Sequence, residues 1–169
     1  MTVATAAGTL AVWRGSAFTD VDGYDAWESL VNERLAAAIG SGELVPIGIG
    51  GDGAFGVRVV VAPDAATERE ARYTVVTSQP YLLTGDGGPV YVSGIEAVGD
   101  AGSSAASIVL PEGRYAVRAS IVAWDDEPGA RGPDGLPGPD ALPDFVVSIA
   151  PSDGSESFRT SEFTFDIPV

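Results

Sequence analysis

Four acidic residues near the start of the chain have the types and the close spacing of a cation site. They are Asp20, Asp22, Asp25 and Glu28. Carboxylate oxygens are the ligands that Ca²⁺ prefers, so these residues predict a calcium site as one alternative. The spacing is not that of an EF-hand loop, because Gly23 comes too early and the terminal Glu is misplaced. Aspartates that form a turn and then begin a helix explain the same residues without a metal, and both interpretations stay open.

The sequence lacks the residue types on which most enzyme mechanisms depend. Its 169 residues include no His, no Cys and no Lys, which supply the common general base, thiolate nucleophile and amine nucleophile. We therefore predict a non-enzymatic protein without a cofactor. One enzymatic alternative is a hydrolase that uses two facing carboxylates. The sequence singles out no such pair among its twenty-four Asp and Glu residues.

A second acidic segment, rich in Pro and Gly, predicts an exposed loop over residues 125–144. Positions 129–140 form four Gly-X-Y triplets, which are too few for a collagen triple helix and indicate a polyproline-like loop. We predict that this segment contacts a partner; the alternative is a solvated insertion without function. The predicted contact residues are Asp125, Asp126, Glu127, Asp134, Asp140 and Asp144.

One Gly-rich segment matches the letters of a dinucleotide-binding fingerprint. Gly48–Gly53 has the G-x-G-x-x-G spacing, but that motif must open a helix whose N-terminus faces the pyrophosphate. The residues that follow it, Phe55–Val61, are typical of a strand instead. Nucleotide binding is therefore not predicted.

The charge of the chain indicates what kind of partner it can bind. Nine Arg face twenty-four acids, for a net charge of -15 at pH 7. Nucleic-acid binding needs clustered cations, so we predict no direct contact with nucleic acid. An acidic surface suits a basic protein, because complementary fields speed association, although acidity also serves solubility alone. We predict an acidic binding protein, inhibitor-like or immunity-like, with a basic protein as its partner.

The sequence also predicts where the protein works. No apolar run reaches the roughly 18 residues that span a bilayer, and no basic stretch precedes the apolar N-terminal residues, as it would in a secretory signal. The absence of Cys fits a reducing compartment. We predict no membrane contact and a cytoplasmic location.

One amphipathic helix and about eight short strands are predicted to build the scaffold. Apolar residues recur at helical spacing from Ala26 to Ile39, and Asp25 with Glu28 has the pattern of a capping box. Strands are predicted where β-branched and aromatic residues cluster between Gly and Pro turns. They cover approximately residues 9–18, 44–49, 55–61, 73–77, 90–98, 107–110, 114–124 and 145–150, with a weaker one at 162–167.

These elements predict one mainly β domain over residues 1–169. Its fold class is an antiparallel β-sandwich with the N-terminal helix packed on it, because no alternation of strands and helices indicates a parallel sheet. Two connections are predicted in detail. Gly50–Gly53 joins residues 44–49 and 55–61 as a hairpin, and Pro111–Gly113 is a tight turn.

Three stretches in order carry a family resemblance. The first is the strand at 9–18 with the helix after it, and the second is the Gly-rich approach to the strand at 55–61. The third contains the motif Leu110-Pro111-Glu112-Gly113-Arg114-Tyr115 and ends in the hydrophobic strand at 145–150. Together they resemble the ComJ-type family of competence nuclease inhibitors, which are small bacterial β-sandwich proteins. The resemblance implies a partner that is a nuclease of DNA entry. It implies no particular contact residues, and the chain departs from the family in its insertion at 129–140 and in its tail after Pro151.

Overall fold

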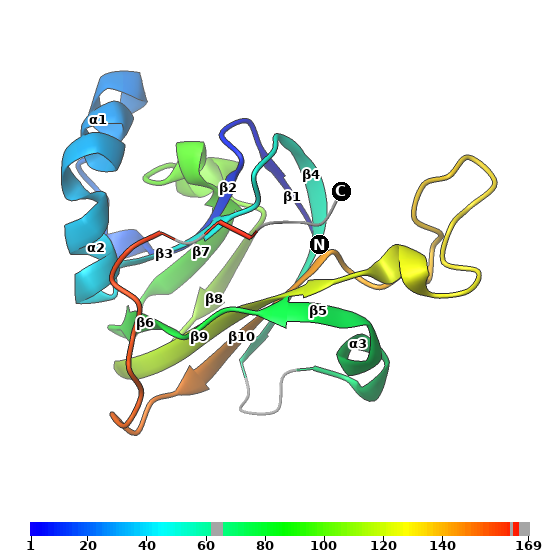
Figure 1. Ribbon diagram of the computed structural model, residues 1–169. Helices are drawn as coiled ribbons and strands as arrows, with labels where there is room; N and C mark the ends of the chain where they lie inside the picture. Colours follow the sequence, from blue (N-terminus) through cyan, green and yellow to red (C-terminus); the bar gives the residue numbers. More distant parts are fainter. Residues whose placement is uncertain (62–65, 163, 166–169) are drawn as a thin grey trace.

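Two β-sheets enclose the core of the computed structural model, which describes residues 1–61, 66–162 and 164–165 (Figure 1). One sheet has four strands in the order β3-β2-β7-β8. These strands are β2 (Thr9–Arg14), β3 (Leu44–Gly48), β7 (Pro89–Gly94) and β8 (Ala106–Val109).

The second sheet has six strands in the order β1-β4-β10-β9-β5, and β6 also pairs with β9. These strands are β1 (Thr2–Thr5), β4 (Gly53–Val61), β5 (Thr74–Thr77), β6 (Tyr81–Gly85), β9 (Gly113–Val122) and β10 (Phe145–Pro151). Apolar side chains from both sheets form one core cluster, as in a β-sandwich.

The predicted β-sandwich is confirmed, with ten strands among the described residues where about eight were predicted. One neighbouring pair is parallel rather than antiparallel. It is the pair of β4 and β10, in which Val57 lies opposite Phe145.

The predicted hairpin at Gly50–Gly53 is wrong. The strands on either side of it, β3 and β4, belong to different sheets, so this turn carries the chain across the sandwich.

The motif Leu110–Tyr115 also joins the two sheets, because β8 and β9 do not pair. Leu110 is fully buried, and the Tyr115 hydroxyl donates to the Pro111 carbonyl at 3.1 Å. This contact is the hydrogen bond of a tyrosine corner, which fixes the angle at which a strand enters a sandwich. A Cβ atom at Gly85 would lie 2.2 Å from the same Pro111 carbonyl oxygen, so only glycine allows this close approach.

The predicted helix is confirmed and is longer than predicted. It runs through α1 (Gly23–Ser29), a π-helical turn (Leu30–Arg34) and α2 (Leu35–Ser41) without a break. It ends at Gly42, whose φ of 75° is left-handed and favours glycine. α2 packs on β3 and β6, so the helix covers one side of the sandwich where both sheets end. No helix of the described residues is both long and apolar enough to cross a membrane.

The predicted cap at Asp25 is wrong. The helix starts at Gly23, Asp22 is the N-cap without a side-chain hydrogen bond, and Asp25 lies in the first turn. A complete capping box occurs instead at α3 (Glu68–Tyr73), a helix that the sequence did not predict. There the Glu70 amide donates to the Thr67 hydroxyl at 3.2 Å, and the Thr67 amide donates to the Glu70 carboxylate at 2.7 Å.

These two helix starts give a paired prediction. Replacing Thr67 with alanine removes a cap and is expected to lower the free energy of unfolding by about 1 kcal/mol. Replacing Asp25 with alanine removes only an interaction with the helix dipole and is expected to cost less than about 0.5 kcal/mol. Urea unfolding of both variants measures the difference, and a larger loss for Asp25→Ala would contradict it.

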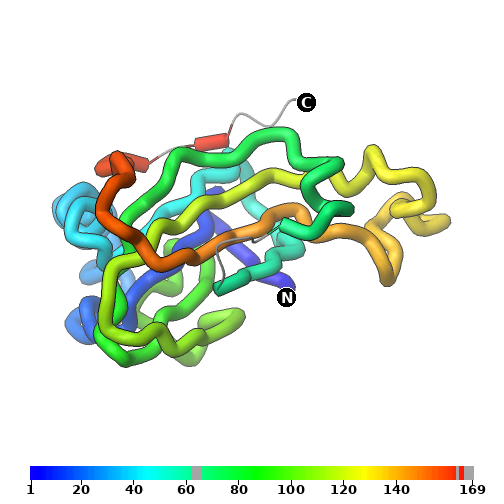
Figure 2. The backbone as a smooth tube through the Cα atoms, turned by 90° about the horizontal axis from the view of Figure 1, so that it is seen from below, coloured from blue at the N-terminus to red at the C-terminus, as the bar shows by residue number. Residues whose placement is uncertain are grey.

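The segment after β10 runs along the side of the sandwich, where it contacts both sheets (Figures 1 and 2). The Arg159 amide donates to the Pro80 carbonyl at 2.9 Å, next to β6, and the Phe165 amide donates to the Gly48 carbonyl at 2.9 Å, at the end of β3. Phe165 is buried beside Phe145. Of the strand predicted at 162–167, residues 163, 166 and 167 lie outside the described residues, and Thr164 forms an isolated bridge with Gly48.

Candidate binding site

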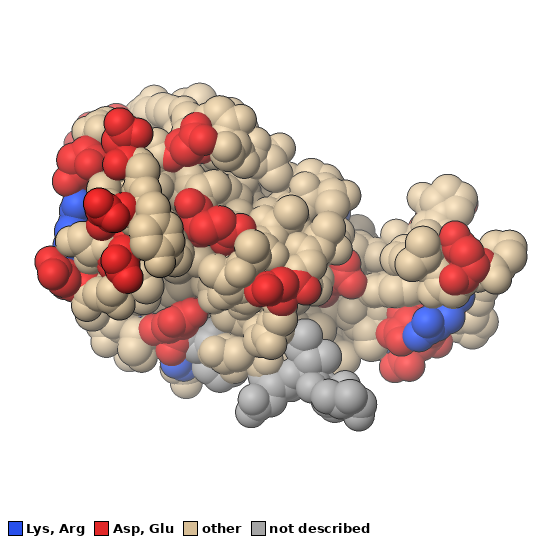
Figure 3. Space-filling view, turned by 90° about the horizontal axis from the view of Figure 1, so that it is seen from above, with Lys and Arg blue, Asp and Glu red and all other residues tan. Residues whose placement is uncertain are grey.

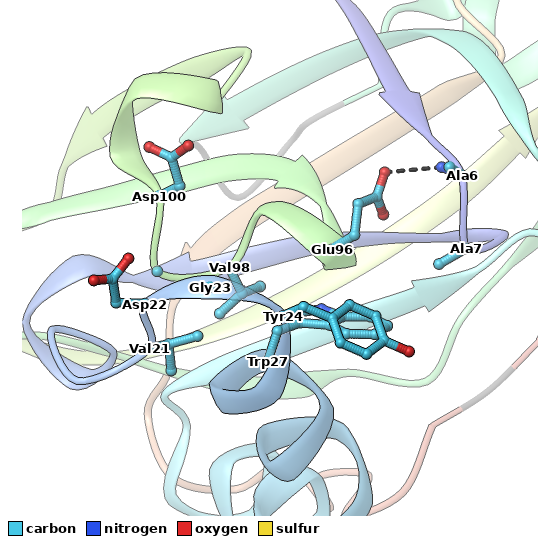
Figure 4. A pocket seen from close by; sticks show the side chains of 11 residues that line it. Ala6, Ala7, Val21, Asp22, Gly23, Tyr24, Trp27, Glu96, Val98 and Asp100 are labelled. Atoms are coloured by element: carbon cyan, nitrogen blue, oxygen red, sulfur yellow. Dashed lines mark hydrogen bonds between the residues drawn. The ribbon is translucent and has the colours of Figure 1, made fainter.

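A groove of about 610 Å³ lies beside the start of α1 (Figure 4). Three carboxylates line it, those of Asp22, Glu96 and Asp100, together with the rings of Tyr24 and Trp27. Asp22 is the N-cap of α1, and Tyr24 and Trp27 lie in its first turns. Glu96 and Asp100 come from the segment that follows β7. We call this site the acidic groove.

The aromatic wall of the acidic groove combines one anchored ring and one exposed ring. The Trp27 indole N–H donates to the Ile95 carbonyl at 2.9 Å, and the indole packs against the core. Tyr24 is 68% exposed, and its ring centroid lies 5.7 Å from that of Trp27 at an interplanar angle of 39°. Their spacing of three residues places both rings on one face of the helix. Much of the Tyr24 ring is therefore available to a ligand.

Hydrogen bonds hold two of the three carboxylates in place. Glu96 accepts from the Ala6 amide at 2.8 Å and from the Thr5 hydroxyl at 3.0 Å. Asp100 accepts from the Ser103 hydroxyl at 2.5 Å and from the Gly102 amide at 2.9 Å. Because these donors stabilise the ionised form, Ser103 and then Gly102 lower the pKa of Asp100 below its ordinary value. Asp100 is therefore charged at neutral pH.

The acidic groove carries negative charge without a neutralising cation in the part of the chain that the structure describes. None of its three carboxylates forms an ion pair there, whereas nearby Asp20 pairs with Arg34 at 2.7 Å. The face of the molecule seen from above shows many acidic side chains and few basic ones (Figure 3). This face is suited to a positively charged ligand.

The structure does not assemble the predicted calcium ligands into a cluster. Asp20 pairs with Arg34, Asp22 lines the acidic groove, and Asp25 and Glu28 lie on α1. Across residues 1–61, 66–162 and 164–165, no three or more Asp, Glu, His or Cys side chains are grouped so as to hold a metal ion. Calcium binding by these residues stays a prediction.

The predicted contact loop, residues 125–144, projects from the body of the molecule (Figures 1 and 2). Two of its acids are in ion pairs, Asp125 with Arg131 at 2.7 Å and Glu127 with Arg69. Hydrogen bonding by Arg69 lowers the pKa of the Glu127 carboxyl.

Asp144 is partly buried and accepts two hydrogen bonds, from the Gly56 amide at 2.6 Å and from the Trp124 indole at 2.8 Å. The remaining predicted contact residues, Asp126, Asp134 and Asp140, are exposed, and Asp134 accepts a hydrogen bond from the Leu136 amide of the same loop at 3.1 Å. Asp126, Asp134 and Asp140 are therefore the predicted contact acids most open to a partner.

Five of the described carboxyl groups are held in their ionised form. Where the pKa of a described carboxyl group departs from its ordinary value, it departs downwards, as at Glu70, Asp86, Asp100, Glu127 and Asp153. A carboxylic acid that donates a proton near neutral pH needs a raised pKa instead. These groups are suited to attracting a cation rather than to giving up a proton.

Sequence reasoning found only part of this site. It singled out Asp22, although for calcium, and it assigned Trp27 to the core face of the helix. The signal that was available for the groove is the aromatic pair at positions 24 and 27 beside an aspartate. Glu96 and Asp100 carry no local signal, because only the fold brings them to α1.

Comparison with models of known protein families and with curated proteins gives no match. Among solved structures, the chain is similar to the protein described as crocagin biosynthetic gene J, with 17% identity over 89% of this chain and 93% of that one, at a TM-score of 0.58. It is also similar to ComJ from Bacillus subtilis, described as an inhibitor of the DNA degrading activity of NucA. That match has 12% identity over 90% of this chain and 94% of ComJ, at a TM-score of 0.47. ComJ is thus among the similar solved structures, as the resemblance described from the sequence leads us to expect. At 17% identity, the match to the crocagin biosynthetic protein shows a shared fold, and this chain has that fold.

Proposed function

We propose that this protein is a non-enzymatic acidic binding protein whose partner is a basic protein. The observation that carries the proposal is the acidic face around α1, where the carboxylates of the acidic groove have no ion-pair partner among the described residues (Figure 3). On a chain with a net charge of -15, such a face attracts cations and repels nucleic acid and anionic membranes.

A cationic nuclease is the partner class to test first. The sequence resemblance described above implies such a partner. A nuclease must also present basic groups to the phosphates of its substrate, and an acidic protein placed over those groups would exclude the DNA. Inhibition by this route needs no catalytic residue in the inhibitor, in keeping with a chain that has no His, Cys or Lys.

The loop at 125–144 is proposed as a second contact surface. Its exposed carboxylates at Asp126, Asp134 and Asp140 lie on a segment that projects from the body at the end away from α1 (Figures 1 and 2). The paired acids of the same loop, Asp125 and Glu127, hold its shape through Arg131 and Arg69.

Affinity capture followed by direct titration tests the proposed function. The immobilised protein is expected to retain a basic protein from an extract of the source cell at low salt. The purified partner is then titrated by calorimetry, and its affinity is expected to fall steeply as salt screens the interface. If the partner is a nuclease, its degradation of DNA is expected to stop at one equivalent of this protein. Recovery of no basic protein, or an affinity that does not change with salt, would count against the proposal.

A further inference from the structure

We infer that the acidic groove binds an arginine side chain of the basic partner, with the guanidinium against the Tyr24 ring and hydrogen-bonded to the carboxylates around it. This inference rests on the proposed function, because it names the part of the partner that is recognised and the residues that recognise it. It is carried by the combination of a cavity, an exposed aromatic face and uncompensated negative charge.

The protein shows elsewhere how it binds an arginine of its own. The Arg131 guanidinium carbon lies 5.5 Å from the centre of the Trp124 ring, and the same guanidinium pairs with Asp125 at 2.7 Å. An aromatic face next to a carboxylate is therefore an arginine site in this molecule. Arg114 and Arg159 likewise lie 5.8 Å from the rings of Phe158 and Tyr81.

The acidic groove has the same two components without the arginine. Its rings and carboxylates line the same groove, but in the described parts of the chain no arginine lies over the ring of Tyr24 or Trp27. Its volume of about 610 Å³ is within the range of small-molecule sites, roughly 300–1,000 Å³, and is ample for one side chain.

The geometry of the groove fits a planar cation (Figure 4). Tyr24 and Trp27 lie side by side along one wall, Asp22 and Asp100 lie toward one end, and Glu96 points toward Ala6. A carboxylate has about four acceptor positions, so Glu96 and Asp100 keep acceptor capacity beyond the two hydrogen bonds that fix each of them. Carboxylates held in place before binding lose little freedom when the ligand arrives.

This chemistry favours arginine over lysine. A guanidinium is planar, weakly hydrated and able to stack on a ring while its edge donates several hydrogen bonds. An ammonium is compact and strongly hydrated, so it gains less from the exposed ring of Tyr24. The groove is therefore expected to discriminate between two cations of equal charge.

Fluorescence anisotropy with labelled hexa-arginine and hexa-lysine peptides tests the inference at low salt. The wild-type protein is expected to bind hexa-arginine more tightly than hexa-lysine. The groove variant Asp22→Asn/Glu96→Gln/Asp100→Asn is expected to bind hexa-arginine at least 10-fold more weakly. Tyr24→Ala, which leaves the charge unchanged, is expected to weaken hexa-arginine binding about 2–5-fold and to remove the preference over lysine.

A variant of equal charge, altered away from both proposed contact surfaces, is the matched control. Glu68→Gln/Glu112→Gln/Asp153→Asn removes the same number of carboxylates from exposed positions outside the acidic groove and the loop and is expected to change hexa-arginine binding less than 2-fold. The carboxylate-to-amide replacements are near-isosteric, and thermal unfolding checks that each variant folds. Because Tyr24 is exposed, Tyr24→Ala keeps the test informative even if the groove variant does not fold.

Three results would overturn the inference. Equal weakening by the groove and control variants would show that charge acts diffusely, and greater weakening by the control variant would place the site outside the groove. Equal affinity of the wild-type protein for both peptides would remove the role of the rings. Each of these results leaves the proposed function standing, because capture of a basic partner tests that function separately.

Discussion

Replacing Trp13 with alanine is expected to lower the free energy of unfolding by about 3–5 kcal/mol. Trp13 lies in β2, a central strand of the four-stranded sheet, and only 1% of its surface is exposed. Its ring meets Phe18 edge-on at 6.0 Å and lies 4.7 Å from the Tyr91 ring, while its indole N–H donates to the Ser93 hydroxyl at 3.0 Å. Truncation leaves a large cavity and removes the donor to the Ser93 hydroxyl, which keeps its own bond to the Gly94 carbonyl; both losses destabilise a closely packed core.

Urea unfolding monitored by circular dichroism measures this loss. Tyr24→Ala serves as the comparison, because it also removes an aromatic ring but from a side chain that is 68% exposed. That variant is expected to lose less than about 1 kcal/mol, since little buried apolar area changes. A loss below about 1 kcal/mol for Trp13→Ala would contradict the burial of this ring in the core.

Replacing Glu70 with alanine is expected to cost about 3 kcal/mol, at the lower end of what breaking a buried ion pair costs. The Glu70 carboxylate is 2% exposed, and it accepts hydrogen bonds from the Arg58 guanidinium and from the amide and hydroxyl of Thr67. Its removal takes away an acceptor that Arg58 and the first turn of α3 both use. Arg58 is one-third exposed, and its partial hydration keeps the loss at the lower end of the range.

The same carboxylate makes part of the stability depend on pH. Burial raises the pKa of Glu70, but the hydrogen bonds from Arg58 and Thr67 outweigh it and bring the pKa below its ordinary value of 4.5. The unfolded chain therefore binds this proton more readily than the folded protein. The stabilisation is complete above pH 4.5 and is lost as the pH falls through the lower folded-state pKa.

Glu70→Gln isolates this effect, because glutamine keeps an acceptor for the Thr67 amide and cannot titrate. The wild-type protein is expected to lose stability between pH 7 and pH 3 more steeply than Glu70→Gln, as measured by urea unfolding at each pH. Other carboxyls with lowered pKa, such as Glu127, still give the variant some loss in acid. Identical pH dependence for the two proteins would contradict the role of Glu70.

The sequence pattern predicted most strands but not which sheet each strand joins. β3 and β4 look like a hairpin locally, because Gly50–Gly53 between two β-branched runs has the composition of a hairpin turn. Their partners are chosen by distant residues, since β4 pairs with β1 on one side and with β10 on the other. The helix α3 was missed because six residues are too few to show a helical period, even though Thr67 and Glu70 form a capping box.

The candidate site was less predictable than the fold. The acids of the loop at 125–144 were predicted to be free, but Arg131 and Arg69 neutralise two of them across spacings that no local pattern reveals. The acidic groove was missed because its carboxylates come from segments far apart in sequence. Composition and charge therefore predict a class of partner, whereas the proposed place of binding depends on the three-dimensional structure.

The chain after β10 has a consequence for self-association. Arg159 hydrogen-bonds to Pro80 and Phe165 to Gly48, so these two residues occupy backbone groups at the margin of both sheets. Unpaired backbone groups at a strand edge can hydrogen-bond to a strand of another molecule, which leads to aggregation. A chain that ends before this segment would expose two such strand edges to other molecules. The segment is therefore expected to reduce self-association.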